Sequence, residues 1–192
     1  MRMLSIGLAL AFGGVMSADE TKDEKKEAKK KPAVPVTLGE YELKVSGEWL
    51  KQNTKSPFRV LQWGIPTAEG DEKAPVCYIS EFPGGVGSVD ANVKRWEGEY
   101  EEKDGEAKKE KVSVEGVKIT MVDVTGVFKD SMGRGPAAGG KVELRKGYRT
   151  LAAMIEPEGG EKVYTIKMVG PKKSVGAQRD DFVSMLKSMK KK

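Results

Sequence analysis

The stretch that decides the fold is "YRTLAAMIEPEGGEKVYTIKMVGP", residues 148–171, which holds two apolar runs around a single turn. Both runs, 148–156 and 163–170, are rich in the β-branched and aromatic residues that favour strands. The connection between them contains Gly159 and Gly160, and a short glycine-containing connection between two such runs is typical of a hairpin. We therefore predict a β-hairpin over this stretch.

The second run of this hairpin alternates, so that successive side chains lie on opposite faces of the predicted sheet. The more apolar face carries Tyr164, Ile166 and Met168. The other face carries Thr165 and Lys167, and we expect Arg149 to lie on that face as well. A ligand of the sheet would bind on this more polar face.

Further strands are expected on the N-terminal side of the hairpin. The stretch "KVSVEGVKITMVDVTGVF", residues 111–128, predicts two strands about a turn at Glu115 and Gly116. The longer of them, 117–128, is apolar on both faces, which predicts a central strand with a bulge near Gly126. Three shorter runs are also expected to contain strands: 41–49, 58–66 and 76–82.

Two segments show the three-and-four spacing of an amphipathic helix. The first follows Ser88, a suitable N-cap, and carries Val89, Val93, Trp96 and Tyr100. The second follows Ser174, and its apolar stripe consists of Phe182, Met185, Leu186 and Met189. Because hairpin connections dominate, we predict an α+β fold, in which a largely antiparallel β-sheet of about six strands is covered by two amphipathic helices in an α/β/α-type sandwich.

The glycine-rich stretch "FPGGVGSVDANVKRW", residues 82–96, raises the question of phosphate binding. A dinucleotide-binding loop needs a third glycine for close helix packing, and Asp90 stands there instead. A P-loop needs a lysine after its last glycine, and Ser88 follows Gly87. We therefore predict a tight strand-to-helix turn capped by serine, with anion binding as the less favoured alternative.

Both ends of the chain differ in composition from the middle. Residues 1–18 resemble a signal peptide, with Arg2 before an apolar stretch of about a dozen residues and small residues at the end, so that cleavage is expected after Ser17 or Ala18. An uncleaved N-terminal anchor is the alternative. Residues 19–35 are nearly all charged and predict a disordered tether, and 36–192 predict a single α+β domain with a basic C-terminal tail. We expect a secreted or periplasmic protein of the bacterial cell envelope, with no stable membrane insertion after signal cleavage.

The charge distribution argues against a nucleic-acid partner. The chain has 34 Lys and Arg against 29 Asp and Glu, and the excess is concentrated at Lys187 and in the three C-terminal lysines, 190–192. A nucleic-acid-binding domain usually carries a basic face on its fold. We expect the lysine tail to be a solvated end, with weak binding of a polyanion or of anionic lipid as the alternative.

The sequence lacks the residues that several kinds of catalytic and metal-binding site require. The sequence contains no histidine, which excludes Ser-His-Asp and Cys-His catalysis and every metal site that requires imidazole. Its single cysteine, Cys77, cannot form an internal disulfide and is expected to be a buried strand residue, although a redox role is left open. No EF-hand calcium loop is present. We predict no cofactor and no metal.

Four stretches carry a resemblance to known proteins: "FPGGVGSVDANVKRW", "GYRTLAAMI", "VYTIKMVGP" and "FVSMLKSM". Together they resemble a group of small secreted bacterial proteins without assigned function. The fold of that group is similar to the fold of the PsbP extrinsic subunits of photosystem II and of the Ran-binding Mog-type proteins. The resemblance implies an antiparallel sheet sandwiched by helices and an extracytoplasmic location, and it implies no activity.

The stretch 129–147 is the best sequence candidate for a binding surface, because it is long, rich in glycine and more basic than acidic. The candidate ligand-binding residues are Arg134, Lys141, Arg145, Lys146, Arg149 and Lys167. Our first hypothesis is a non-enzymatic binding or accessory domain for a protein or an envelope component. The alternatives are a histidine-free, hydrolase-like enzyme with its site at 129–147 and a weak anion or polyanion binder. An idle mobile loop, or a loop with a short added strand at 142–144, would be a purely structural explanation.

Overall fold

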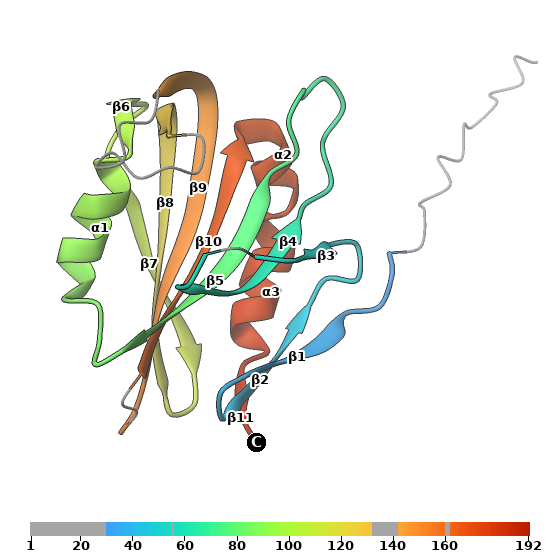
Figure 1. The fold of residues 1–192 in the computed structure, drawn as a ribbon, viewed down its shortest axis with the longest axis vertical. Helices are drawn as coiled ribbons and strands as arrows, with labels where there is room; N and C mark the ends of the chain where they lie inside the picture. Colours follow the sequence, from blue (N-terminus) through green and yellow to red (C-terminus); the bar gives the residue numbers. More distant parts are fainter. Residues whose placement is uncertain (1–29, 55, 132–141, 160–161) are drawn as a thin grey trace, which may run out of the picture.

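The computed structural model describes residues 30–54, 56–131, 142–159 and 162–192, which form two antiparallel sheets and three helices (Figure 1). In chain order the elements are β1 (Val34–Leu38), β2 (Tyr41–Val45), β3 (Leu50–Gln52), β4 (Arg59–Gly64), β5 (Val76–Pro83), α1 (Val89–Glu97), β6 (Tyr100–Lys103), β7 (Lys108–Val114), β8 (Val117–Asp130), β9 (Glu143–Pro157), β10 (Lys162–Pro171), α2 (Lys172–Ala177), α3 (Arg179–Lys187) and β11 (Lys190–Lys191).

The large sheet is built around the predicted hairpin, which consists of β9 and β10. Its strand order is β3-β4-β5-β10-β9-β8-β6, and β7 also pairs with β8. Every strand pair in it is antiparallel, which confirms the predicted sheet type. Strand β8 is central, with a register shift between Gly126 and Phe128 that confirms the predicted bulge.

The large sheet has eight strands rather than the predicted six or so. The additional strands lie at its edges, in the charged stretch after α1 and in the segment before β4. Strand β3 and most of β6 and β7 are exposed to solvent. Their sequences therefore lack the alternation of apolar residues by which a half-buried strand is recognised.

A second, three-stranded sheet has the order β1-β2-β11. Strand β1 begins at Val34, two residues before the predicted start of the domain. Strand β11 consists of C-terminal lysines that we expected to be a solvated tail. The ammonium group of Lys190 lies 3.2 Å from the carboxylate of Glu42, and that of Lys191 lies 3.3 Å from Glu40. These ion pairs partly neutralise two of the C-terminal lysines, so that less positive charge is available to bind a polyanion.

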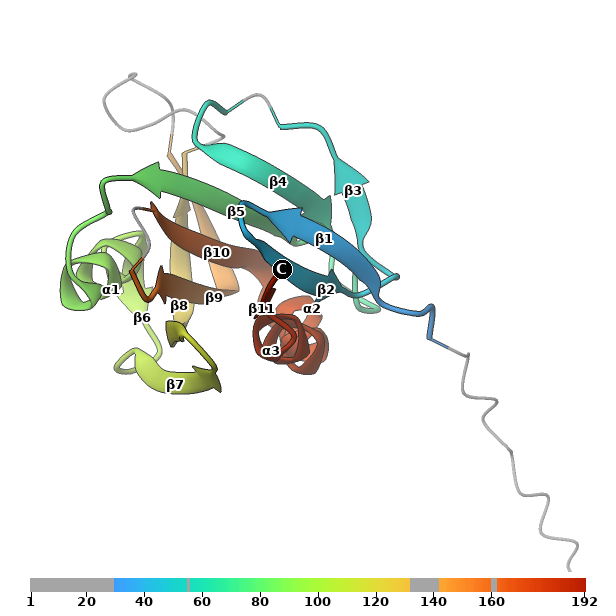
Figure 2. The same cartoon turned by 90° about the horizontal axis from the view of Figure 1, so that it is seen from below.

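The helices cover both faces of the large sheet. Helices α2 and α3 lie on one side together with the small sheet, and α1 lies on the other side (Figure 2). The larger core fills the first side and includes Leu43, Ile79, Ile155 and Phe182. The predicted second helix is therefore two helices, because the chain turns at Gln178 between α2 and α3.

Helix α1 begins as the sequence predicts. The Ser88 hydroxyl accepts a hydrogen bond from the amide of Ala91 at 3.2 Å, which satisfies one free donor of the first turn. Val93 and Trp96 are buried against β8 and β9, in a core with Val122 and Met154. The predicted stripe is therefore confirmed over these residues, although Tyr100 belongs to β6 rather than to the helix.

The start of α2 is capped by a residue from a distant loop. Ser174, which we expected to be the cap, lies inside the helix and is buried. Its amide and its hydroxyl donate to one carboxylate oxygen of Asp71, at 2.9 Å and 2.5 Å. The same hydroxyl accepts from the amide of Ala68 at 2.8 Å. Asp71 and Ser174 thus join the β4–β5 loop to the helix.

Replacing Asp71 by alanine should lower the free energy of unfolding by about 1–3 kcal/mol. The change removes a cap and leaves a buried hydroxyl without its acceptor. Urea denaturation measures the loss, and Glu72→Ala in the same loop is the matched control because Glu72 is exposed. Equal stabilities of the two variants would contradict the capping role.

Candidate functional site

The basic residues predicted to form a site are not brought together by the fold. Arg134 and Lys141 lie outside the described residues. Strands β8 and β9 continue to Asp130 and Glu143, so that both ends of the stretch 129–147 are strand rather than loop. Arg145 pairs with both of these acids, at 3.3 Å from Asp130 and in direct contact with Glu143.

Arg149 and Lys167 lie on opposite faces of the large sheet, so the prediction that they share a face is wrong for Arg149. Arg149 stands opposite Gly170 in the hairpin and lies on the side of α2. Its guanidinium donates two hydrogen bonds to Asp123, at 2.9 Å and 2.6 Å. A shift of one residue in the pairing of two strands moves each side chain to the other face of the sheet. The sequence does not fix this pairing for β9 and β10.

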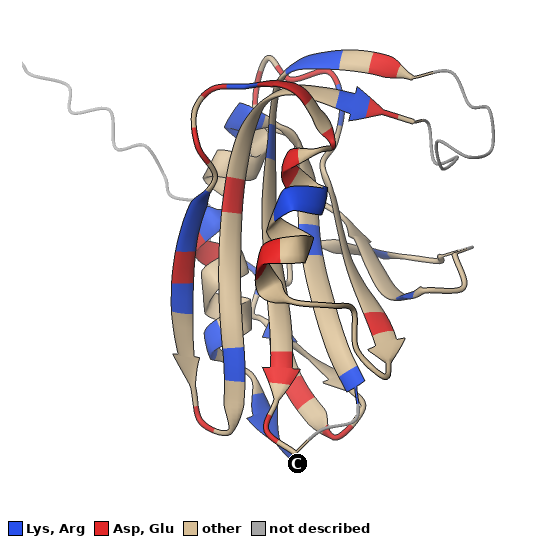
Figure 3. Cartoon of the chain, turned by 90° about the vertical axis from the view of Figure 1, so that its left-hand side faces the viewer, with Lys and Arg blue, Asp and Glu red and all other residues tan. Residues whose placement is uncertain are grey.

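Lys167 lies on the predicted face but is buried there. Its ammonium group contacts the carboxylate of Glu99, just after α1, and lies 5.7 Å from the centre of the Phe128 ring. A lysine that is already paired and covered has little left to offer a ligand. Figure 3 shows basic and acidic residues interspersed over this side of the molecule.

Lys146 is exposed and lines, with Arg145, a hollow of about 630 Å³ at the base of the predicted binding edge. The opposite wall comes from the β4–β5 loop and contributes two acids and a lysine: Asp71, Glu72 and Lys73. This hollow therefore carries both signs of charge rather than the basic character that we expected.

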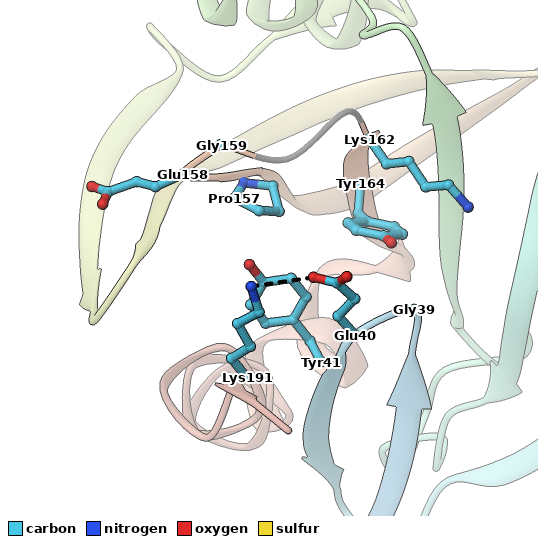
Figure 4. Close-up of a pocket in the computed structure, with 9 residues that line it drawn as sticks. All are labelled: Gly39, Glu40, Tyr41, Pro157, Glu158, Gly159, Lys162, Tyr164 and Lys191. Atoms are coloured by element: carbon cyan, nitrogen blue, oxygen red, sulfur yellow. Dashed lines mark ion pairs between the residues drawn. The ribbon is translucent and has the colours of Figure 1, made fainter.

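A cleft that the sequence did not predict lies between the tip of the β9–β10 hairpin and the small sheet (Figure 4). Its volume is about 460 Å³. Its walls come from the β1–β2 turn, the two strands of the hairpin and β11. The lining residues are Gly39, Glu40, Tyr41, Pro157, Glu158, Gly159, Lys162, Tyr164 and Lys191.

The β1–β2 turn shapes one wall of this cleft through Gly39. The backbone of Gly39 has a φ of +57°, which an L-residue adopts at a cost. A Cβ atom at this position would lie 2.5 Å from the hydroxyl oxygen of Tyr164. Glycine therefore permits both the turn and the approach of the tyrosine from the hairpin.

Two tyrosines give the cleft its chemistry. Tyr41 is 7% exposed and Tyr164 is 3% exposed, and no described residue makes a hydrogen bond to either hydroxyl. Within the described part of the chain, the only fully buried side-chain polar atom without a partner is Oδ1 of Asn92, so both hydroxyls still reach the open cleft. Buried tyrosine hydroxyls usually find a partner. These two are free to bond a group that enters the cleft.

Tyr164 is protonated at neutral pH. Burial raises the pKa of Tyr164 above its ordinary value, so the hydroxyl keeps its proton at neutral pH and acts as a donor. The rim is close to neutral, because Glu40 pairs with Lys191 at 3.3 Å and Lys162 pairs with Glu81 at 2.7 Å. The cleft thus offers two donors between aromatic walls, without a strong field of either sign.

The single cysteine of the chain lies in the core. Cys77 is fully buried, and burial raises the pKa of its thiol far above the usual range, which suits a core residue. No group of three or more metal-binding side chains occurs within the described ranges. None of the helices in the described part of the chain is long and apolar enough to cross a membrane.

The glycine-rich turn before α1 keeps an open backbone. Gly84, Gly85 and Gly87 all have positive φ, and a Cβ atom at Gly84 or Gly85 would meet nothing within 4 Å. The Asn92 side chain ties the turn to the helix by donating to the carbonyl oxygens of Val86 and Ser88, at 3.1 Å and 2.9 Å. The turn is thus held by the helix itself, as a capped strand-to-helix connection.

No protein-family model and no curated protein sequence matches this chain. Solved structures match its fold, and two of them are as follows. Cyanobacterial PsbP (CyanoP) from Synechocystis sp. PCC 6803 is 12% identical, with a TM-score of 0.51 over 84% of this chain and 93% of that one. The Ran-binding protein Mog1p from Saccharomyces cerevisiae is 11% identical, with a TM-score of 0.51 over 84% of this chain and 96% of that one. The chain therefore has a PsbP/Mog1-like fold.

Proposed function

We propose that this protein is a non-enzymatic binding or accessory domain, which holds an extended segment of a protein partner in the cleft between the β9–β10 tip and the small sheet. The observation that carries this proposal is the pair of hydroxyls of Tyr41 and Tyr164, which face the cleft and have no partner among the described residues. A polypeptide supplies what these donors lack, because each peptide unit presents a carbonyl oxygen.

The walls of the cleft suit a polypeptide better than a small charged ligand. Tyrosine rings supply contact area at a low cost in conformational entropy, and the hydroxyls supply direction. The two ion pairs on the rim neutralise their own charges, so the attraction to a free anion or cation is weak. The fold neighbour Mog1p is a Ran-binding protein, which is consistent with a protein partner for this chain too.

The proposed location is outside the cytoplasm, in the periplasm or beyond it. The sequence supports this location through the signal-like residues 1–18 and the charged stretch 19–35, which would separate the domain from the cleavage point. Mass spectrometry of the mature protein tests it directly. A new N-terminus after Ser17 or Ala18 would support secretion, and an intact Met1 in a cytoplasmic fraction would contradict it.

Selection of a phage-displayed dodecapeptide library on the wild-type chain tests the binding proposal. Peptides that bind the cleft should lose affinity about 10–30-fold on the double variant Tyr41→Phe/Tyr164→Phe, because each lost hydrogen bond contributes about 1 kcal/mol. Removing hydroxyls that have no intramolecular partner should leave the melting temperature unchanged. Tyr78→Phe, which changes a tyrosine of the opposite sheet face, is the matched control and should bind normally.

Two results would contradict the proposal. One is a set of selected peptides that bind the double phenylalanine variant as well as they bind the wild type. The other is the absence of any peptide that binds the folded chain in the micromolar range or better.

A further inference from the structure

The first residues of β9 form a strand edge that no other described strand covers. On one side, β9 pairs with β8 from Glu143 onward. On the other side its partner β10 ends early, because the last pair of that ladder joins Pro171 to Tyr148. No described residue makes a backbone hydrogen bond to residues 143–147 on this second side, and Figure 1 shows this end of β9 curving beyond the end of β10. This stretch, the β9 edge, therefore carries main-chain donors and acceptors without a partner strand.

A bulge in β9 separates this edge from β10. Gly126 pairs with Tyr148 and Phe128 pairs with Arg145, so β9 has one residue more than β8 between these two pairs. Gly147 lies in the bulge with a φ of +65°, and a Cβ atom there would meet nothing within 4 Å. Bulges bend the strand that contains them and are frequent where pairing ends or beside functional sites. The bend therefore accounts for the loss of pairing between the β9 edge and β10.

The β9 edge presents an apolar and a cationic side chain on the same face. Leu144 and Lys146 are two residues apart and both precede the bulge, so their side chains share a face. Arg145, between them, points to the face of α1, where its partner in the ladder is Phe128. Leu144 is 54% exposed, and Lys146 is exposed and has no ion-pair partner among the described residues. The face on the side of α2 is therefore open to a ligand at both positions.

The β9 edge is also one wall of the hollow of about 630 Å³ that Lys146 lines. The opposite wall is the β4–β5 loop, which Asp71 fixes to α2 by accepting hydrogen bonds from Ser174. This wall also contains Glu72 and Lys73, so it carries charges of both signs. A segment that enters the hollow thus lies beside a strand edge whose free charge on this face is positive.

We propose that the β9 edge binds an extended segment of a protein partner as an added strand, which runs through this hollow. A polypeptide matches a row of main-chain donors and acceptors, whereas a lipid or an inorganic anion does not. The segment carries an apolar residue beside Leu144 and an acidic residue beside Lys146, two positions apart, because facing side chains of neighbouring strands lie on one face. A second copy of the chain is a poorer occupant, because its β9 arrives with β8 attached and the hollow has the β4–β5 loop as its far wall. No residue of this hollow lines the tyrosine cleft, and the proposal does not rest on the proposed function.

The test uses two fluorescein-labelled octapeptides of the same composition, titrated into the full chain and followed by fluorescence anisotropy. In the peptide TVTETVTE, valine and glutamate are two positions apart and share a face of the strand. In TTVETTVE they are adjacent and lie on opposite faces. The first peptide should bind in the micromolar range and the second at least about fivefold more weakly. Methylating alternate backbone amides of the first peptide should abolish binding, because strand addition needs those donors.

Substitutions in the β9 edge test the two side-chain contacts. Leu144→Ser should weaken binding of TVTETVTE about fivefold or more, because the leucine loses an apolar contact. Val142→Ser is the matched control, since Val142 is 48% exposed and does not line the hollow, and should bind within about twofold of the wild type. Lys146→Glu should weaken binding about three- to tenfold, and the difference should shrink with added salt. Lys94→Glu makes the same charge change on exposed α1 and should bind normally.

Hydrogen exchange of the full chain shows where the peptide binds. TVTETVTE should slow the exchange of amides within residues 143–147, because an added strand accepts their hydrogen bonds. Binding without this protection, equal binding of the methylated peptide, or no micromolar binding of TVTETVTE would overturn the proposal. Self-association that Leu144→Ser abolishes would also overturn it, because the occupant would then be a second copy. Tyr41→Phe/Tyr164→Phe should bind TVTETVTE normally, and a loss of binding there would place the peptide in the tyrosine cleft instead.

Discussion

Replacing Trp96 by alanine is expected to lower the free energy of unfolding by about 3–5 kcal/mol, as the truncation of a large core residue does. The indole is buried between α1 and the large sheet, in the same cluster as Val93, Val122 and Met154. Alanine would leave a cavity under the only helix that the described residues place on this face. Urea denaturation measures the loss.

Lys94→Ala is the control for Trp96→Ala, because Lys94 is exposed on the same helix. We expect that variant to lie within about 0.5 kcal/mol of the wild type. A loss below 1 kcal/mol for Trp96→Ala would mean that the indole is not packed as described, and it would reopen a role for Trp96 in stacking on a ligand.

Replacing Gly126 by alanine should cost at least about 3 kcal/mol, because overpacking adds to backbone strain. The residue has a φ of +152° at the bulge of β8. A Cβ atom there would lie 2.0 Å from the carbonyl oxygen of Glu102 and 2.9 Å from the Cα atom of Lys103. Both obstacles are backbone atoms of β6, so that strand would have to move away from β8.

Gly116→Ala is the control that separates the backbone strain of a positive φ from the steric clash with β6. Gly116 has a φ of +67° in the β7–β8 turn, and a Cβ atom there would meet nothing within 4 Å. That variant should lose only the strain, about 1–2 kcal/mol. Equal losses for the two variants in thermal or urea unfolding would show that the contact between β6 and β8 is looser than the structure has it.

The central part of the fold could be predicted from the sequence because its elements are buried on defined faces. The β9–β10 hairpin has two apolar runs around a glycine pair, and the alternation in β10 correctly separates Ile166 from Lys167. The same reasoning failed for Arg149, since the pattern within one strand does not fix its register against the next. It also missed β6 and β11, whose residues are mostly charged and solvent-exposed.

The candidate site could not be predicted, because its parts are distant in the sequence. Gly39 and Tyr41 come from one end of the chain, Tyr164 from the central hairpin and Lys191 from the other end. In a single strand, Tyr41 and Tyr164 are indistinguishable from ordinary core residues. Only the pairing of β11 with β2 brings the C-terminal lysines to the same place, through ion pairs that lie beyond local sequence patterns.

The prediction that Arg145 and Arg149 are available to a ligand was wrong for an electrostatic reason. Composition alone counts the charges of Arg145 and Arg149 as available, but the fold places Asp130 and Asp123 beside them. Lys51 and Arg59, in the β3–β4 hairpin, have no acidic partner among the described residues. A polar stretch separates them in the sequence, so they do not form a recognisable basic motif. Whether a charged side chain can bind a ligand depends on its ion-pair partners in the fold, and not on the number of charges in the sequence.

The most direct test of the central claim is a ¹H–¹⁵N correlation spectrum of the full chain, titrated with a dodecapeptide selected on the wild-type protein. The binding proposal predicts that the largest shift changes fall on backbone amides that line the tyrosine cleft: Gly39, Tyr41, Gly159, Tyr164 and Lys191. The amides of α1 should not move. Changes confined to other surfaces, with these cleft amides unchanged at saturation, would contradict the claim that this cleft is where the protein binds its partner.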